Sequence, residues 1–311
     1  MKICMLGLGS IGAQHTKNLA HILKSEDIPF QIDALRIQNH PPEKGVSELI
    51  ADIYSSFEVL PNDYDVIFIN TPTNLHFQHL SQAIHHAKHI FVEKPVFDKT
   101  DYNWQAILNG SRGVYYVACP LRYHRVIAYL KCCINKQKIF SARAICSSYL
   151  PDWRPGTDYR TCYSAIAAQG GGVRIDLIHE WDYLIHLFGM PDHVSSLSGT
   201  YSNLEITSED LAVYIAEYPE TLLSLHLDYF GRVPRREIEL YTAEDVLIGD
   251  LIKQEIRFIK SGEVIVLTQS RVEMQRAELV AFLAMVREGK PNKNTIENAV
   301  NTMRIAMEGI T

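Results

Sequence analysis

Three features are absent from the 311-residue sequence, and each absence excludes a class of protein. No stretch of about 18 consecutive apolar residues occurs, so no segment is long enough to cross a membrane as a helix. The chain begins with a strand-like segment rather than an apolar leader, so we expect no secretory signal. Lys and Arg number 30 against 36 Asp and Glu, for a net charge of -6, and the basic residues are dispersed, whereas nucleic-acid binding needs a basic stripe. We therefore expect neither a membrane nor a nucleic acid as partner.

Paired cysteines and metal-binding motifs are missing as well. The six cysteines include no CxxC pair, so reduced thiols in a cytoplasmic protein fit better than a disulfide framework. The pair His179-Glu180 lacks the second histidine of an HExxH zinc motif. We expect a cytoplasmic location and no metal ion.

Length and composition indicate a globular protein with two domains. A prior of roughly 150 residues per domain gives two for this chain. A hydrophobic content of 47% with 21% charged residues is ordinary for a globular enzyme. The pattern of segments changes after Pro120, so we predict a first domain over residues 1–120 and a second over residues 121–311.

Strands and helices alternate through the first 120 residues. Uninterrupted apolar runs closed by turn signals are typical of strands buried in a parallel sheet. A helix is expected from about residue 74 to residue 87. The predicted strands are Lys2–Leu6, Ile32–Ile37, Asp65–Asn70, His89–Pro95 and Gly113–Cys119. This alternation predicts a doubly wound parallel sheet, the Rossmann fold.

Beyond Pro120 the pattern is that of an α+β domain. Alternating β segments separated by short turns run from Val194 to Thr268 and predict a large, mainly antiparallel sheet with one open face. An amphipathic helix is expected over residues 172–188, after a polar loop at 151–169. The other expected elements are a helix at 126–135, a strand at 139–149 and helices at 272–288 and 296–307. The last helices either stay with this domain or pack back on the Rossmann domain.

The glycine-rich turn after the first strand predicts a dinucleotide site. Gly7, Gly9 and Gly12 supply a tight turn, a close approach to a pyrophosphate and close helix packing, and the backbone of Ser10 and Ile11 opens the helix that faces the phosphates. A lone GxGxxG motif is weak evidence, but its position between a strand and a helix strengthens it. The alternative is a glycine turn with a structural role only.

The second strand bears on the choice between NAD and NADP. An acidic residue at its end would bind the ribose hydroxyls of NAD, whereas a basic one accommodates a 2′-phosphate. The residues there are Leu35-Arg36-Ile37-Gln38-Asn39-His40, with no carboxylate. NADP is therefore slightly favoured over NAD, with Arg36 as the phosphate partner. Alternatively, Arg36 is a surface cation or stacks on adenine.

Four motifs in a fixed order make the sequence resemble the Gfo/Idh/MocA family, which includes glucose-fructose oxidoreductase and inositol 2-dehydrogenase. They are the Gly7–Gly12 turn, Asn70-Thr71-Pro72-Thr73-Asn74 with His76, Glu93-Lys94-Pro95, and Gly170-Gly171-Gly172 followed by Asp176 and His179. The resemblance implies that the Thr-Pro turn lies near the cofactor, that Lys94 sits beside the reacting carbon, and that Asp176 and His179 complete the site. The expected cofactor-binding residues are Gly7, Gly9, Ser10, Ile11, Gly12, Arg36, Asn70, Thr71, Pro72, Asn74, His76, Glu93 and Lys94.

The chemistry of alcohol oxidation assigns roles to the three candidate catalytic residues. Histidine exchanges protons near neutral pH, so His179 is the expected general acid/base, while Lys94 stabilises charge on the reacting oxygen. Asp176, three residues earlier on the expected helix, would bind substrate or orient the imidazole. The commonest family spacing is four residues, so Glu180 or a local shift in the helix would alter which group faces the cofactor. The alternative for His179 is a core histidine bonded to Asp182 or a carbonyl.

A loop rich in Trp, Tyr and Arg, residues 151–160, suggests a substrate site. Trp153, Arg154 and Tyr159 suit sugar stacking or an anionic group, and Arg122 would line the same cleft. The loop also resembles loops in relatives acting on sugars tied to surface-glycan synthesis. The alternative is that Trp153 and Tyr159 only anchor a long loop.

The sequence thus predicts an NAD(P)-dependent oxidoreductase of CH-OH groups in a sugar, cyclitol or sugar-derived substrate. Its open sheet face predicts a homodimer or homotetramer. One alternative is a non-catalytic dinucleotide-binding sensor or regulator, against which Lys94 and His179 both weigh. A second is a reductase of a non-sugar substrate, such as a tetrapyrrole or an imine.

Overall fold

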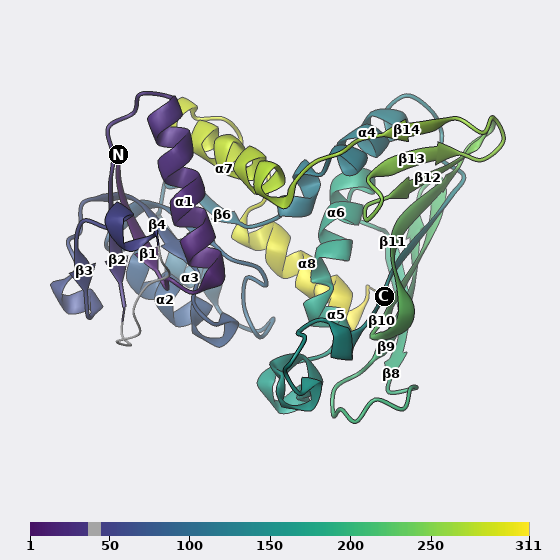
Figure 1. The fold of residues 1–311 in the computed structure, drawn as a ribbon, viewed down its shortest axis with the longest axis horizontal. Helices are drawn as coiled ribbons and strands as arrows, with labels where there is room; N and C mark the ends of the chain where they lie inside the picture. Colours follow the sequence, from purple (N-terminus) through teal and green to yellow (C-terminus); the bar gives the residue numbers. More distant parts are fainter. Residues whose placement is uncertain (37–44, 311) are drawn as a thin grey trace. The chain divides into compact units, whose positions relative to one another are not determined.

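The computed structural model describes residues 1–36 and 45–310 and contains two compact units (Figure 1). The first unit comprises Met1–Pro120 and Arg271–Val300. The second comprises Leu121–Ser270 and the residues after Val300. Among the described residues, no helix has both the length and the apolar character needed to cross a membrane.

The first unit is built on a six-stranded, wholly parallel sheet in the order β3-β2-β1-β4-β5-β6. The predicted doubly wound sheet is therefore confirmed, with the two-residue β3 as a strand too short to give a sequence signal. Four of its strands are nearly continuous buried apolar runs, as expected for strands covered on both faces. The strands are β1 (Lys2–Leu6), β2 (Gln31–Leu35), β3 (Ile53–Tyr54), β4 (Tyr64–Ile69), β5 (Ala87–Val92) and β6 (Tyr115–Val117).

Helices α1 (Ser10–Ser25), α2 (His76–Ala83), α3 (Trp104–Leu108) and α7 (Arg271–Glu288) accompany this sheet, with the single turns η1 (Ser47–Leu49), η2 (Phe57–Val59) and η3 (Thr73–Leu75). Helix α1 buries Ala13, Leu19 and Leu23 and packs beside α7. The helix expected at 74–87 is shorter than predicted, because β5 already begins at Ala87.

The second unit is built on an eight-stranded sheet in the order β14-β13-β12-β11-β7-β10-β9-β8. All its neighbours are antiparallel except β7 and β10, so the prediction of a mainly antiparallel sheet is confirmed. The strands are β7 (Ser141–Tyr149), β8 (His193–Gly199), β9 (Leu211–Tyr218), β10 (Thr221–Asp228), β11 (Phe230–Tyr241), β12 (Val246–Asp250), β13 (Glu255–Phe258) and β14 (Val264–Val266).

One face of this sheet is covered by helices, and Figure 1 shows α4 (Arg125–Ile134) and α6 (Ile178–Phe188) on that side. Alternate residues such as Tyr214, Leu225 and Ile238 are buried beneath them. Helix α8 (Ile296–Glu308) ends the described fold, and η4 (Pro120–Tyr123) precedes α4. The loop between β7 and α5 forms the short turns η5 (Leu150–Asp152), η6 (Tyr159–Thr161), η7 (Tyr163–Ala165) and η8 (Ala167–Gln169).

The prediction of one continuous helix over residues 172–188 is wrong. Helix α5 (Val173–Asp176) ends at Leu177, whose φ of -98° and ψ of 21° leave the helical region, and α6 starts at the next residue. The carboxylate of Asp176 is bonded to two tyrosines outside the helix, which anchors α5 separately from α6. Asp176 and His179 therefore lie on different helices and are not spaced by regular helical geometry.

Candidate active site

Three loops meet at the carboxyl edge of the parallel sheet, the usual ligand-binding edge of this fold. The strand register aligns Leu6 with Ile69, and Ile69 with Val92. The residues that follow these three strand ends are Gly7, Asn70 and Glu93, and backbone hydrogen bonds of 2.8 Å and 2.9 Å continue the ladder into them. The glycine turn, the Asn-Thr-Pro motif and the Glu-Lys-Pro motif are thus brought side by side within one unit.

The three glycines of the turn differ in backbone conformation and in the space around them. Gly7 has a φ of +87°, a conformation that side chains rarely adopt. A Cβ on Gly12 would lie 2.2 Å from the carbonyl oxygen of Gly7, so only glycine allows α1 to pack this closely on the turn that follows β1. A Cβ on Gly9 would meet no atom within 4 Å, so the space beside Gly9 is open.

The first turn of α1 presents free donors to that open space. Its N-cap is Gly9, which has no side chain to bond the first N–H groups, and the turn contains no acidic residue. Nearby Asn70 is buried, and neither polar atom of its side chain has a hydrogen-bond partner in the described part of the chain. Uncapped N–H groups, a positive helix end and an unpaired amide fit the pyrophosphate and ribose of a dinucleotide.

The end of β2 lies only partly within the described residues. Arg36 follows the strand, is half-buried and donates its backbone N–H to Tyr54. Residues 37–40 of the segment considered for cofactor selectivity lie outside the described residues. The buried carboxylate of Asp33 accepts hydrogen bonds from Tyr64 and Gln31, so this acidic residue of β2 is engaged inside the unit.

His76 connects two of the motif loops. Its Nε2 lies 2.8 Å from the carbonyl oxygen of Thr71, and its Nδ1 lies 3.0 Å from that of Pro95. Burial lowers the pKa of His76, although these carbonyl contacts act in the opposite direction. The His76 ring therefore links the Thr-Pro turn to the Glu-Lys-Pro turn. Pro72 and Asn74 are exposed on the same turn.

Lys94 is held in place by its neighbour. The Glu93 carboxylate accepts a hydrogen bond of 3.2 Å from the backbone N–H of Lys94 and a second contact of 2.6 Å from Nε2 of His15. His15 is buried on α1, the helix that starts at the glycine turn. The peptide bond between Lys94 and Pro95 is cis. The backbone of the candidate catalytic lysine is thus tied to the candidate cofactor helix.

In the second unit, Asp176 is engaged by two tyrosines. Tyr163 donates to one carboxylate oxygen, and Tyr229 donates to the other at 2.6 Å. Burial and the charge of Asp176 raise the pKa values of both tyrosines, so both hydroxyls keep their protons and act as donors. This arrangement fastens the 151–169 loop to α5.

His179 lies at the start of α6 with 18% of its side chain exposed. Its Nε2 contacts the guanidinium of Arg236 and lies 3.3 Å from Oε1 of Glu180. Glu180 is fully buried, so the break at Leu177 leaves His179, rather than Glu180, as the partly accessible group. Asp182, which the sequence offered as a partner for His179, forms an ion pair of 2.7 Å with Arg122 instead.

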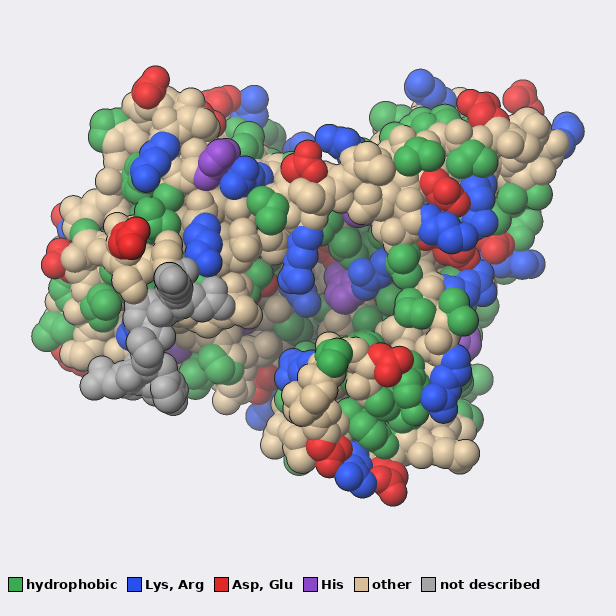
Figure 2. Space-filling view, in the orientation of Figure 1, with side chains coloured by type: hydrophobic (Ala, Val, Ile, Leu, Met, Phe, Trp, Pro, Cys, Tyr) green, Lys and Arg blue, Asp and Glu red, His purple; other side chains and the backbone are tan. Residues whose placement is uncertain are grey.

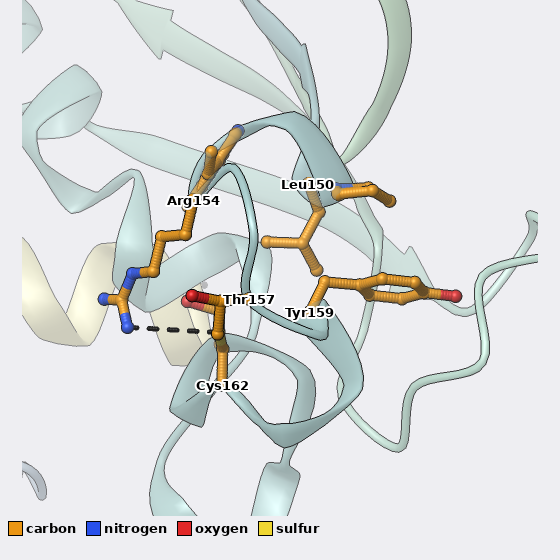
Figure 3. Close-up of a pocket in the computed structure, with 8 residues that line it drawn as sticks. Leu150, Arg154, Thr157, Tyr159 and Cys162 are labelled. Atoms are coloured by element: carbon orange, nitrogen blue, oxygen red, sulfur yellow. Dashed lines mark hydrogen bonds between the residues drawn. The ribbon is translucent and has the colours of Figure 1, made fainter.

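The aromatic loop of the second unit forms a small pocket, shown in Figure 3. Its lining residues are Leu150, Pro151, Trp153, Arg154, Thr157, Tyr159, Cys162 and Ser164. Trp153 donates to Ser148 and packs its ring edge on Tyr229, while Arg154 bonds the sulfur of Cys162. The pocket's empty volume of about 220 Å³ includes open solvent, so by itself the pocket is too small for a complete ligand.

The exposed end of this loop is a cluster of ion pairs. Arg160 pairs with Asp158 at 2.9 Å and with Glu205 at 2.7 Å, and Figure 2 shows red and blue side chains adjoining at the lower end of this unit. The hydroxyl of Tyr159 accepts from the backbone of Glu205. Among the described residues, no group of three His, Cys, Asp or Glu side chains is placed to hold a metal ion.

Two residues beside the candidate site were missed by sequence reasoning. His15 gives no signal, because a histidine inside an amphipathic helix looks like a surface residue. Arg236 does give one: it alternates with Ile238 and Leu240 on β11, so it occupies the apolar, helix-covered face of the sheet. A charged residue at such a position needs a buried partner.

The first unit has the architecture of a dinucleotide-binding Rossmann domain, with its glycine turn, open helix end and polar loops at one edge. Residues 1–108 match the model of the Gfo/Idh/MocA family, described as an oxidoreductase family with an NAD-binding Rossmann fold. This match confirms, over residues 1–108, the resemblance predicted from the sequence.

Two Bacillus subtilis proteins are similar in sequence. The uncharacterized oxidoreductase YrbE is 27% identical over 190 residues, which are 60% of this chain and 53% of that protein. The scyllo-inositol 2-dehydrogenase (NAD+) is 33% identical over 99 residues, which are 31% of this chain and 28% of that protein. The matches therefore span about half of the first relative and less than a third of the second.

Solved structures resemble the chain over nearly its whole length. The UDP-N-acetylglucosamine 3-dehydrogenase GnnA from Acidithiobacillus ferrooxidans has a TM-score of 0.77 at 19% identity, covering 99% of this chain and 96% of that one. A levoglucosan dehydrogenase in complex with NADH and levoglucosan has a TM-score of 0.84 at 15% identity, covering 98% and 95%. At these identities the likeness shows the fold.

Proposed function

We propose that this protein is an NAD(P)-dependent oxidoreductase acting on the CH-OH group of a sugar, a cyclitol or a sugar-derived substrate. The observation that carries the proposal is the edge of the parallel sheet, where an uncapped glycine turn, the unpaired amide of Asn70 and the loop of Lys94 follow adjacent strands. This combination supplies phosphate-binding donors and a cationic side chain in one unit.

The residues present fit a nicotinamide dinucleotide. The N–H groups of Ser10, Ile11 and Gly12 would bind the pyrophosphate, and Asn70, with the Thr71–Asn74 turn, would contact the rest of the cofactor. When bound, the nicotinamide accepts a hydride from an alcohol carbon or supplies one to a carbonyl carbon. NAD or NADP remains the proposed cofactor, with Arg36 as the residue on which NADP selectivity would depend.

The chain's own residues would handle charge and protons. Lys94 would donate a hydrogen bond to the reacting oxygen and stabilise negative charge on it, and His179 would accept or return the hydroxyl proton. Asp176 would hold the loop of Tyr163 next to the substrate. Trp153, Arg154, Tyr159 and Arg122 are the further substrate residues that we propose.

The proposed substrate class rests on chemistry and on the named relatives. Aromatic and arginine side chains on the loop suit a hydroxylated ring or an attached anionic group. Relatives of similar fold or sequence are named for scyllo-inositol, levoglucosan and a UDP-linked sugar. A role in surface-glycan precursor synthesis is the finer proposal. In this view residues 1–120 bind the cofactor, and residues 121–311 bind substrate and join the subunits.

A second copy of the chain is the proposed partner. The face of the eight-stranded sheet opposite α4 and α6 carries Leu197, Val213, Ile215, Leu222 and Ile145, which the strand register places on one side. Leu197 is 77% exposed and Leu222 is 49% exposed. Exposed apolar side chains on one sheet face are typical of a symmetric interface, so we propose a homodimer or homotetramer.

Fluorescence titration with NADH and NADPH tests the proposal, followed by a panel of sugars, cyclitols and sugar nucleotides with the preferred cofactor. Saturable binding and turnover of at least one panel member would support it. Failure to bind either cofactor would refute it. Binding without turnover on any panel member would favour the sensor alternative.

A further inference from the structure

The buried ion pair of Glu180 and Arg236 contacts the imidazole of His179. Oε1 of Glu180 lies 2.8 Å from the guanidinium of Arg236, and Tyr183 donates to the other carboxylate oxygen. Glu180 and Tyr183 are fully buried on α6, and Arg236 lies opposite Cys146 on the helix-covered face of the sheet. Burial raises the pKa of Glu180, and the charge of Arg236 opposes that rise. Arg236 reaches both this carboxylate and Nε2 of His179.

The contact between Arg236 and His179 has only one chemically allowed direction. A guanidinium carries donors alone and stays protonated at any working pH, so Nε2 of His179 must accept. An imidazole whose Nε2 accepts a hydrogen bond carries no proton there, and in its neutral form the proton sits on Nδ1. The opposite requirement comes from Glu180, whose Oε1 lies 3.3 Å from the same Nε2 and, in the carboxylate form that pairs with Arg236, can only accept.

We propose that Arg236 and Glu180 are positioning residues that set the protonation state of His179. Arg236 holds the neutral ring in its Nδ1–H tautomer, and Glu180 accepts from Nε2–H when the ring gains a proton. A proton arriving on Nε2 breaks the contact with Arg236, which stays paired with Glu180. The proposal deepens the acid/base role given to His179 and in that respect rests on the proposed function.

Other titratable groups near Glu180 and Arg236 belong to the elements packed against them. From β7, Cys146 bonds both Arg236 and Glu180, and burial raises the pKa of its thiol to about 12. His124, which precedes α4, interacts electrostatically with the same guanidinium. Burial and the charge of Arg236 both lower the pKa of His124. Burial disfavours the charged form of both groups, so neither one supplies a cation in place of Arg236.

The tautomer is measurable without any substrate. Nitrogen-15 spectra of the labelled full-length protein, with the His179 signals assigned from their loss in His179→Gln, report which ring nitrogen carries the proton. We expect the neutral ring of the wild-type protein to be protonated on Nδ1. A neutral ring protonated on Nε2 would overturn the proposal, whatever the protein's activity proves to be.

Charge substitutions test the same point by titration. Arg236→Gln removes the cation and should raise the midpoint of the His179 titration by about one pH unit, a tenfold change in its proton affinity. Arg236→Lys keeps a cation and should restore much of the wild-type midpoint. Glu180→Gln should move the midpoint down. The matched control is Arg235→Gln, the adjacent exposed arginine that pairs with Glu237, and it should leave the midpoint unchanged.

The pH–rate profile separates this proposal from the proposed function. If both hold, the acid limb of the profile for alcohol oxidation shifts upward in Arg236→Gln in parallel with the His179 midpoint. Turnover with an unshifted limb and midpoint in both Arg236→Gln and Glu180→Gln would refute the positioning role while leaving the dehydrogenase intact. The expected tautomer in a protein that turns over no substrate would refute the enzymatic function alone.

Discussion

Nε2 of His15 lies 2.6 Å from Oε1 of Glu93, although 78 positions separate the two residues in the chain. His15 belongs to the helix that follows the glycine turn, and Glu93 precedes the candidate catalytic lysine. The imidazole also packs against the rings of Phe68 and Phe91, at centroid distances of 5.9 Å and 5.2 Å. The pair therefore fixes α1, the helix that follows the glycine turn, relative to the loop of Lys94 within the first unit.

Removing this histidine should destabilise the first unit. His15→Ala leaves the Glu93 carboxylate without its main hydrogen-bond partner, and a largely buried carboxylate left without its partner costs about 1–3 kcal/mol. Gln carries an amide nitrogen at a similar reach, so His15→Gln should recover part of the loss. Denaturant unfolding measures both changes. His21→Ala, at an exposed position of the same helix, is the control, and a His15→Ala variant as stable as this control would contradict the assignment.

The same pair predicts a pH dependence of stability. Burial opposes ionisation of Glu93, but the hydrogen bond and charge of His15 outweigh it and hold the pKa of this carboxyl below its ordinary value of 4.5. A lowered pKa in the folded state means that the unfolded state binds more protons, so the stabilisation is present above about pH 4.5 and disappears as the pH falls through the folded value. Unfolding free energies measured from pH 7 to pH 3 should therefore fall less steeply in His15→Ala than in the wild type. Parallel curves would count against the pair.

Two glycines of the turn should respond differently to the same substitution. A Cβ at position 12 meets the backbone of Gly7, so Gly12→Ala should destabilise the fold by about 1–3 kcal/mol. A Cβ at position 9 meets no protein atom, so Gly9→Ala should fold normally and weaken dinucleotide binding by about tenfold, or 1.4 kcal/mol. Thermal unfolding and NADH titration on both variants separate the effects. An unchanged affinity for NADH in Gly9→Ala would contradict the proposal that the cofactor occupies the space beside Gly9.

Lys94 should matter for chemistry more than for binding. Lys94→Ala removes the donor proposed for the reacting oxygen and should lower turnover by about 100-fold or more, with cofactor affinity within a few fold of wild type. The readouts are steady-state kinetics and cofactor titration. Lys99→Ala, an exposed lysine a few residues further along the chain, serves as the matched control. Full activity in Lys94→Ala would refute the catalytic role.

The sequence predicted those features whose cause is local. Apolar runs and turn residues located five of the six strands of the parallel sheet, and for the second sheet they located one strand and the region that holds the others. The position of Gly7, Gly9 and Gly12 predicted a turn whose geometry the structure bears out. Strand β3 was missed because two residues are too few for a periodic pattern.

Features that depend on tertiary contacts escaped prediction. The break at Leu177 goes with bonds from Asp176 to Tyr163 and Tyr229, which are distant in sequence, so helical periodicity alone predicted one unbroken helix. The contact between His179 and Arg236 likewise could not be predicted from the sequence. The two residues are 57 positions apart, and strand pairing brings Arg236 to the face of the sheet that His179 contacts. Catalytic roles for Lys94, Asp176 and His179 stay predictions until they are measured.

The open sheet face yields the last prediction, on the assembly of the chain. Leu222 lies at the start of β10, and Ile215 lies on the neighbouring strand β9 on the same face of the sheet. If that face joins two copies, a charge at position 222 must be buried in the interface without a partner, which is strongly unfavourable. Leu222→Glu should therefore shift the protein toward monomers in size-exclusion chromatography with light scattering. Ile252→Glu places the same charge on an exposed residue in a turn and should leave the assembly unchanged. A wild-type monomer, or a Leu222→Glu variant with the wild-type mass, would exclude this face as the interface.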